Sequence, residues 1–358
     1  MSRIIGYDDL IEVTSEILEK FGYSPKAALI TAEVLAEADA RGVPSHGVAR
    51  LDFYWKNIQG GFAVPDAEPR IVKETPVSLL VDGCNGVGPY VTDFAVNRML
   101  EKAAASGVAF CAVRNSNHYG MAGLWAERAV RSDMVGMAFT NTRTCAIPTF
   151  GRERIFGTNP IAVAVPELSG RSFMIDMATT TVAHGKVEVY DRRKQPMPEG
   201  WAVDENGRGM TDATAFEKLF WENPRYGGHL FLGGEGEDLG GHKGYGLGLM
   251  VELLCAGLSL GKWSLHTFEK GQGSGIAHFF GAFRLDLFAD SQEVKKHIGE
   301  ILKEIRTSGK ADGHDRIFIA GEKEAEKREE SLEKGVFLDD STCDIINLFA
   351  RQFGTKGV

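Results

Sequence analysis

Residues 91–140 alternate helical and extended patterns, and they read VTDFAVNRMLEKAAASGVAFCAVRNSNHYGMAGLWAERAVRSDMVGMAFT. Apolar residues at helical spacing predict helices over Val91–Ala105 and Ala122–Arg131. Short β-rich runs predict strands over Val108–Arg114 and Val135–Thr140. Strands that alternate with helices are typical of an α/β protein, here with a mixed or largely parallel sheet.

The alternation of helical and extended patterns continues on both sides of this stretch. It predicts further strands near Ser78–Val81, Ile161–Val165 and Phe173–Asp176, and further helices over Leu247–Leu258 and Glu293–Ile305. Residues 192–241 are rich in Gly, Pro and Asp. They predict a long irregular excursion, and excursions of that length in compact proteins are often functional.

Both ends of the chain are predicted to be helical. A first helix carries an apolar stripe from Leu10 to Phe21, and a second begins at Ser24-Pro25, a capping residue followed by proline. Helix-rich sequence returns from Glu322 to Phe353. We expect the two ends to form one discontinuous unit, residues 1–75 plus 300–358, beside a sheet domain of residues 76–299.

Composition excludes several classes of protein. The 358 residues include 43% hydrophobic and 25% charged residues, and the formal net charge is −9, so disorder is excluded and nucleic-acid binding is disfavoured. The most apolar window, residues 246–260, contains Glu252 and is too short to cross a membrane. Acids near the N-terminus argue against a secretion signal. The five cysteines form no C-x-x-C pair, so we expect reduced thiols in a cytoplasmic protein and no metal site.

The usual cofactor and nucleophile motifs are missing. G-x-G-x-x-G between a strand and a helix is absent, and the nearest phrases, such as Gly83-x-x-Gly86-x-Gly88, have the wrong spacing. A Walker A loop, an H-E-x-x-H helix and a G-x-S-x-G elbow are absent too. Motifs alone therefore assign no cofactor and give little support to nucleophilic catalysis.

Two histidines and one arginine are candidates for chemistry. His46 lies in RGVPSHGVAR with Arg50 close behind, and His118 lies in RNSNHYG just after a predicted strand. Ligands of open α/β sheets collect outside the carboxyl ends of strands, which favours His118. The alternative for each histidine is a structural role, and for Arg50 a surface ion pair. A histidine and an arginine without metal ligands suit proton transfer beside a bound carboxylate.

Two further residues are candidates for cofactor contacts. Lys243, in GGHKGYGLG, could reach a phosphate, or it could be a solvated lysine at a helix start. Asp176 ends the predicted strand in FMIDMATT, where an acid could bind a ribose hydroxyl or cap the next helix.

Seven phrases in register resemble one family. They are RGVPSHGVARL, SNHYGMAG, FTNT, FGTNPIAVAVP, MIDMATTTVAHGKV, MPEGWAVD and GGHKGYGLGLMVE. Together they resemble the malate/L-lactate dehydrogenase family, whose members lack a Rossmann fold and include sulfolactate, ureidoglycolate and 2,3-diketogulonate oxidoreductases. The resemblance extends from the opening helices to about Glu322.

The resemblance implies a fold, an assembly and a set of site residues. It implies an NAD(P)-binding domain with a mixed sheet of non-Rossmann topology, and a homodimer, which we expect the helical unit from both chain ends to hold together. It also implies that His46 and His118 are the acid/base candidates and that Ser45 and Arg50 bind substrate. The cofactor positions that it implies are Thr142, Asp176, Met177, Ala178, His242, Lys243, Gly321 and Glu322. The last two stand in a phrase that usually reads P-G-E and here reads Ala320-Gly321-Glu322.

The expected reaction is reversible hydride transfer between C2 of a 2-hydroxy acid and C4 of nicotinamide, with NAD expected first and NADP as the alternative. Malate and oxaloacetate are the first substrate pair. The alternatives are L-lactate, sulfolactate, ureidoglycolate, a cyclic imino acid, and a carboxylate-binding protein without activity. His118 is the favoured proton carrier because it follows a strand end.

Overall fold

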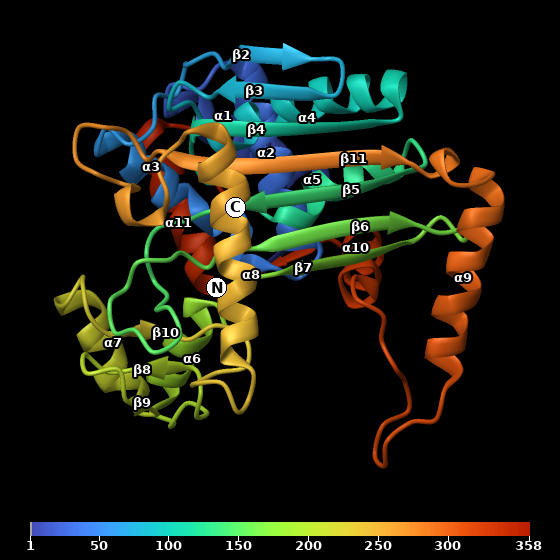
Figure 1. The fold of residues 1–358 in the computed structure, drawn as a ribbon. Coiled ribbons are helices and arrows are strands. Elements are labelled where there is room, and N and C mark those ends of the chain that lie inside the picture. Colours follow the sequence, from blue (N-terminus) through green and yellow to red (C-terminus); the bar gives the residue numbers. More distant parts are fainter. Residues whose placement is uncertain (1) are drawn as a thin grey trace.

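A seven-stranded mixed sheet forms the centre of the computed structural model, which describes residues 2–358 (Figure 1). The strands, in their order across the sheet, are β2 (Arg70–Thr75), β3 (Ser78–Asp82), β4 (Val108–Ser116), β11 (Ile276–Arg284), β5 (Met134–Thr140), β6 (Ile161–Pro166) and β7 (Ser172–Met177). Only β3 and β4 pair in parallel, and every other pair in this sheet is antiparallel. The α/β class with a mixed sheet is confirmed, and the largely parallel alternative is wrong.

One cause of the mixed sheet, besides the antiparallel pairs β2–β3, β5–β6 and β6–β7, is strand β11. It comes from far along the chain and inserts between β4 and β5, antiparallel to both. Seven of its nine residues are buried, so it is a central strand. We did not predict it. The five predicted strands are all present, and their ends differ from the prediction by at most two residues.

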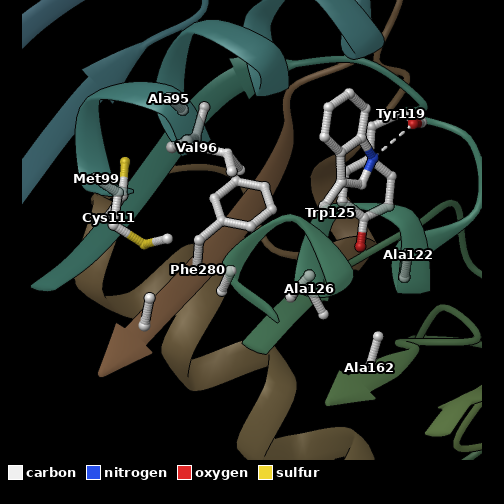
Figure 2. Packing of buried hydrophobic residues seen from close by; sticks show 14 of the residues in the cluster. Ala95, Val96, Met99, Cys111, Tyr119, Ala122, Trp125, Ala126, Ala162 and Phe280 are labelled. Carbon is white, nitrogen blue, oxygen red and sulfur yellow. Dashed lines mark hydrogen bonds between the residues drawn. The ribbon is translucent and has the colours of Figure 1, made fainter. Parts of the chain in front are cut away.

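Helices cover both faces of the sheet (Figure 1). On one face lie α4 (Gly88–Ser106), α5 (Ala122–Val130) and α2 (Pro25–Ala40), which share the largest hydrophobic core with the sheet. Figure 2 shows Phe280 of β11 between the helices, near Val96 and Trp125, and the Trp125 ring nitrogen donates to the Tyr119 carbonyl at 2.9 Å.

The opposite face is covered by α8 (Gly241–Glu252) and the π-helical turn Leu253–Gly257. We predicted this helix from Leu247, but it begins six residues earlier, because the glycine-rich phrase GGHKGYG forms its start and not a loop. The helix α9 spans Ser291–Thr307, close to its prediction. Among the described residues, no helix is long and apolar enough to cross a membrane.

The two chain ends pack together into a second core (Figure 1). Its elements are α1 (Tyr7–Lys20), α2, α3 (Leu51–Gln59), α11 (Asp340–Phe353) and a two-stranded sheet of β1 (Arg3–Ile5) with β12 (Val336–Leu338), next to α10 (Glu322–Lys334). Leu10, Ile17 and Leu35 are fully buried inside this subunit. The apolar stripes that we expected to need a second copy are therefore covered already, which removes that argument for the dimer interface. The domain limits and the homodimer stay predictions.

Residues 192–241 are irregular over much of their length, as predicted, but they also contain short regular elements. They build most of a third, small core with α7 (Ala213–Glu222) and three two-residue strands, β8 (Ala202–Val203), β9 (Gly209–Met210) and β10 (Gly228–His229). The helix α6 (His184–Arg193) packs on α7. Strands of two residues are too short to give a period in the sequence, so these strands were not predicted.

A buried carboxylate joins α8 to the ends of the strands. Glu252 is 4% exposed and accepts hydrogen bonds from the side-chain amides of Asn141 (2.9 Å) and Asn159 (2.8 Å). It also accepts from the backbone N–H and the hydroxyl of Ser264, each at 2.8 Å. Four donors satisfy this carboxylate without a cation, which makes the network one unit.

We predict that Glu252→Ala lowers the free energy of unfolding by about 3 kcal/mol or more, because each buried donor left without its acceptor costs roughly 1–3 kcal/mol. Guanidinium titration followed by fluorescence measures the change. Glu304→Ala, at an exposed acid of α9, is the matched control and should leave the midpoint unchanged. Equal midpoints for both variants would contradict the assigned role of the network.

Candidate functional site

Strand directions bring the predicted residues to one edge of the sheet. The pairings make β3, β4, β5 and β7 point the same way, so their carboxyl ends share one edge. His118 follows β4, Thr142 follows β5 and Asp176 is at the end of β7. From β4 to β7 there are four strand spacings of roughly 4.8 Å, so the edge between them extends about 19 Å. This is the left edge of the sheet in Figure 1, beside α3 and the small core.

The phrase around His46 forms two short turns between helices. After α2 the chain makes 3₁₀ turns at Pro44–His46 and Val48–Arg50 and then enters α3. These turns place the His46 ring against the His118 ring, with centroids 5.5 Å apart and planes 27° apart. The Ser45 hydroxyl lies 3.0 Å from Nδ1 of His46. Two histidines that are 72 residues apart in the sequence therefore meet at one place.

His118 is held by its backbone neighbours. A Cβ at Gly88, the first residue of α4, would lie 2.0 Å from the His118 carbonyl oxygen, so only glycine allows this approach. The side-chain amide of Asn117 donates to the carbonyls of Asn85 and Gly86, both at 2.9 Å. These contacts fix the direction in which the segment leaves β4.

Tyr54 is a site residue that the sequence reasoning missed. Its hydroxyl lies 3.0 Å from Nδ1 of His118, and the side chain is 5% exposed. A hydroxyl can donate or accept, so this bond can persist in either protonation state of the histidine. Tyr54 stands four residues after Arg50, one helical turn away, and that spacing is the signal that could have identified it.

Arg50 provides a positive charge at this place, and the more distant carboxylate of Glu188 offsets it in part. Its Nε donates to the Ser45 carbonyl at 2.5 Å, and its Cζ lies 5.8 Å from the centre of the Phe53 ring. Within residues 2–358 no carboxylate forms an ion pair with it. Burial lowers the pKa of Arg50, yet an arginine stays charged at physiological pH. A half-buried guanidinium without an ion-pair partner is suited to a bidentate carboxylate ligand.

Both histidines are neutral near pH 7. Burial, and then the charge of Arg50, lower the pKa of His46 to about 4. The same two causes, in the same order, hold the pKa of His118 well below the ordinary value of 6.5. The site therefore combines one cation with two neutral imidazoles that can accept a proton.

The residues predicted to contact cofactor from the sheet lie at the same edge. The backbone N–H of Thr158 donates to the Thr142 hydroxyl at 2.9 Å. The Asp176 carboxylate accepts the N–H of Gly123 at 2.6 Å in the first turn of α5. It therefore caps a helix that precedes it in the sequence, whereas we had considered that it could cap the helix that follows. Burial is the main cause that raises the pKa of Asp176 to about 6. Met177 and Ala178 continue from it and are half-buried.

The other predicted cofactor residues divide into two kinds. His242 and Lys243 are exposed in the first turn of α8, and in the described part of the chain Lys243 forms no ion pair. Gly321 precedes α10 and packs against Met174 of β7. The Glu322 carboxylate accepts from Arg306 at 2.5 Å and from Arg316 at 3.2 Å, so it already has a structural role between α9 and α10. The cofactor role of each of these residues stays a prediction.

The described residues contain no group of His, Cys, Asp and Glu that could hold a metal ion. The five cysteines form no disulfide.

Comparisons with known proteins agree with the resemblance in the sequence. Residues 5–347 match the family described as "Malate/L-lactate dehydrogenase". The chain is 41% identical to a malate dehydrogenase of Pyrococcus abyssi, over 99% of this chain and 96% of that protein. It is 34% identical to an L-sulfolactate dehydrogenase of Methanocaldococcus jannaschii, over 95% and 94%.

A solved structure extends the likeness to the fold. The malate dehydrogenase of Pyrococcus horikoshii OT3 superposes with a TM-score of 0.89 at 36% identity, covering 100% of this chain and 97% of that chain. Sequence and structure thus agree over nearly the whole length. The chain belongs to the malate/L-lactate dehydrogenase family, and it is an oxidoreductase that acts on CH–OH donors with a nicotinamide cofactor.

Proposed function

We propose that this chain interconverts a 2-hydroxy acid and its 2-oxo acid, with malate and oxaloacetate as the first substrate pair. The observation that carries the proposal is the unpaired Arg50 beside the neutral His46 and His118. The malate dehydrogenase relative supports malate, and the sulfolactate dehydrogenase relative supports sulfolactate as the second candidate. L-Lactate, ureidoglycolate and cyclic imino acids complete the panel to be tested.

Arg50 is the proposed partner of the substrate carboxylate. Two parallel N–H donors of one guanidinium match the two oxygens of a carboxylate, and such a pair fixes direction as well as position. Ser45, whose carbonyl already binds Arg50, keeps its hydroxyl beside His46. When Arg50 binds the substrate carboxylate, the substrate carbon C2 therefore lies next to the two histidines.

The residues at the sheet edge fit a nicotinamide dinucleotide. The N-terminus of α8 carries a partial positive charge, and His242 and Lys243 are exposed there and form no ion pair within residues 2–358. Asp176 adds a carboxylate that can accept from hydroxyl groups. When bound, the nicotinamide supplies the hydride acceptor or donor. We propose NAD first and NADP as the alternative, and rates with both cofactors on one substrate panel decide between them.

His118 is the proposed proton carrier. In the oxidation direction its Nε2 takes the proton of the substrate hydroxyl, while Nδ1 stays bonded to the Tyr54 hydroxyl. In reduction the same nitrogen returns the proton to the carbonyl oxygen. His46, which stacks on His118, positions the substrate and is the alternative carrier.

We predict that His118→Ala lowers kcat and kcat/KM together by about 10²–10⁴, because the proton transfer is made only in the transition state. Steady-state kinetics with oxaloacetate, or the best 2-oxo acid found, measures the loss. His297→Ala, at an exposed histidine of α9, is the control and should keep wild-type rates. A larger loss of kcat/KM in His46→Ala than in His118→Ala would make His46 the proton carrier and His118 the positioning residue. Near wild-type kcat/KM for both variants would refute the assignment.

A second prediction concerns pH. Oxidation needs a neutral base, so kcat/KM falls as pH drops through the pKa of that base in the free enzyme. Since burial and Arg50 lower the pKa of His118, this acid limb should lie below pH 6.5. Arg50→Gln removes one cause, so the limb should move upward while KM for the hydroxy acid rises. Arg351→Gln, at an exposed position of α11, is the control. An unchanged limb in Arg50→Gln would contradict the electrostatic account.

A third prediction concerns the cofactor. Lys243→Ala should raise the dissociation constant of the cofactor and leave kcat at saturating cofactor nearly unchanged, because a phosphate contact is the same in the ground and transition states. Fluorescence titration of the reduced nicotinamide measures it. Lys303→Ala, an exposed lysine of α9, is the matched control. If both variants bind cofactor equally well, the role given to Lys243 is wrong.

A further inference from the structure

A buried carboxylate that the proposed mechanism does not use lies under the His46 turn. Asp39 is in the last turn of α2 and is 6% exposed. Its Oδ2 accepts the backbone N–H of Val48 at 2.7 Å. No cation in residues 2–358 forms an ion pair with it. A buried carboxylate without a cation is costly for a fold, so its presence calls for a physical reason.

The carboxylate also touches the residue next to His46. A Cβ at Gly47 would lie 2.0 Å from Oδ1 of Asp39 and 2.3 Å from its Oδ2. The two oxygens therefore rest against the backbone of Gly47 and Val48, in the middle of the segment that carries both His46 and Arg50. The Gly47 carbonyl in turn accepts the N–H of Arg50 at 3.0 Å.

The other hydrogen bonds of this segment are local. The N–H groups of His46 and Gly47 donate to the carbonyls of Val43 and Pro44, and the Arg50 side chain donates to the Ser45 carbonyl. Bonds of this kind shape the turn but do not fix its direction against α2. The bond from Val48 to Asp39 joins the second half of the turn to the helix, and the buried Val48 side chain fills the core beside it.

We propose that Asp39 is a positioning residue, whose carboxylate holds residues 45–50 against α2 so that His46 and Arg50 face His118. This inference rests on the proposed function, because Asp39 can affect the reaction only if His46 and Arg50 have the roles proposed for them. Burial raises the pKa of Asp39 to about 7, with Asp339 adding to the rise and the Val48 N–H opposing it, which agrees with a carboxyl group retained in an unfavourable place.

The expected defect is in substrate binding. If the turn moves, Arg50 no longer meets the substrate carboxylate, and that contact is made in the ground state as well as in the transition state. Asp39→Ala should therefore raise KM for the 2-oxo acid by about 10- to 100-fold, the size of effect that a displacement near 1 Å produces. The cofactor dissociation constant should stay unchanged, since within residues 2–358 no hydrogen bond or ion pair joins the start of α8 to this turn.

Two variants separate positioning from stability. Asp39→Asn keeps the shape and an acceptor oxygen for the Val48 N–H, so it should restore KM to within about twofold of wild type. Ser24→Ala removes the side chain that caps the opposite end of α2, where it accepts the Ala27 N–H at 3.3 Å. It should lower Tm without raising KM, which shows what loss of stability does by itself.

The experiment measures KM, kcat, cofactor binding and Tm for all three variants and for Gly47→Ala. The last variant forces a methyl group against the Asp39 carboxylate and should raise KM as Asp39→Ala does, which keeps the test valid if Asp39→Ala does not fold. The proposal is overturned if Asp39→Ala and Gly47→Ala raise KM no more than Ser24→Ala, or if Asp39→Asn is as defective as Asp39→Ala. Failure of the proposed function is a different result, namely wild-type kinetics in Arg50→Gln and His118→Ala.

Discussion

His278, in the central strand β11, makes a hydrogen bond to each neighbouring strand at the edge where the site lies. Its Nδ1 is 2.8 Å from the Thr140 hydroxyl of β5, and its Nε2 is 2.8 Å from the Ser116 hydroxyl of β4. A hydroxyl can donate or accept, so a neutral ring satisfies both bonds, with one ring nitrogen donating and the other accepting. Burial lowers the pKa of His278 to about 3, which keeps the ring neutral as this arrangement requires. The strand ends that lead to His118 and Thr142 are thus joined through one buried ring.

The register of β4 against β11 then directs His118. Ile276 pairs with Ser116 and His278 with Val113, so β4 carries one extra residue there, and Asn115 adopts a positive φ of 52°. A bulge of this kind bends a strand and changes the aim of the residues that follow. The chain leaves the sheet towards the helical core of the two chain ends, where Tyr54 meets His118. The sheet supplies one histidine and the helical core supplies Arg50, so the packing of these two cores sets the distance between proton carrier and carboxylate partner.

How much of this could be predicted from the sequence depends on whether the cause is local. The strand ending near Arg114 and the phrases around His46 and His118 were predictable, because periodicity and short motifs carry them. The position of β11 was not, since nothing local states which distant strand will insert between two neighbours. Tyr54 was recoverable from helical spacing. Asp39 was not, because one acid in an alanine-rich helix becomes special only when the turn of Gly47 folds onto it. The cofactor was inferred only from the resemblance to a family, because the sequence contains no glycine fingerprint for a dinucleotide.

The charge of Arg50 links substrate binding to the protonation of the histidines. In the free site it helps to hold the pKa of His118 well below its ordinary value. A substrate carboxylate that pairs with Arg50 cancels this contribution, so the pKa of His118 rises when an anionic substrate binds. Oxidation needs a neutral imidazole and reduction needs a protonated one, and a reversible enzyme must populate both. An unpaired arginine beside two neutral histidines meets this requirement, because the substrate itself brings the anion that makes proton uptake favourable.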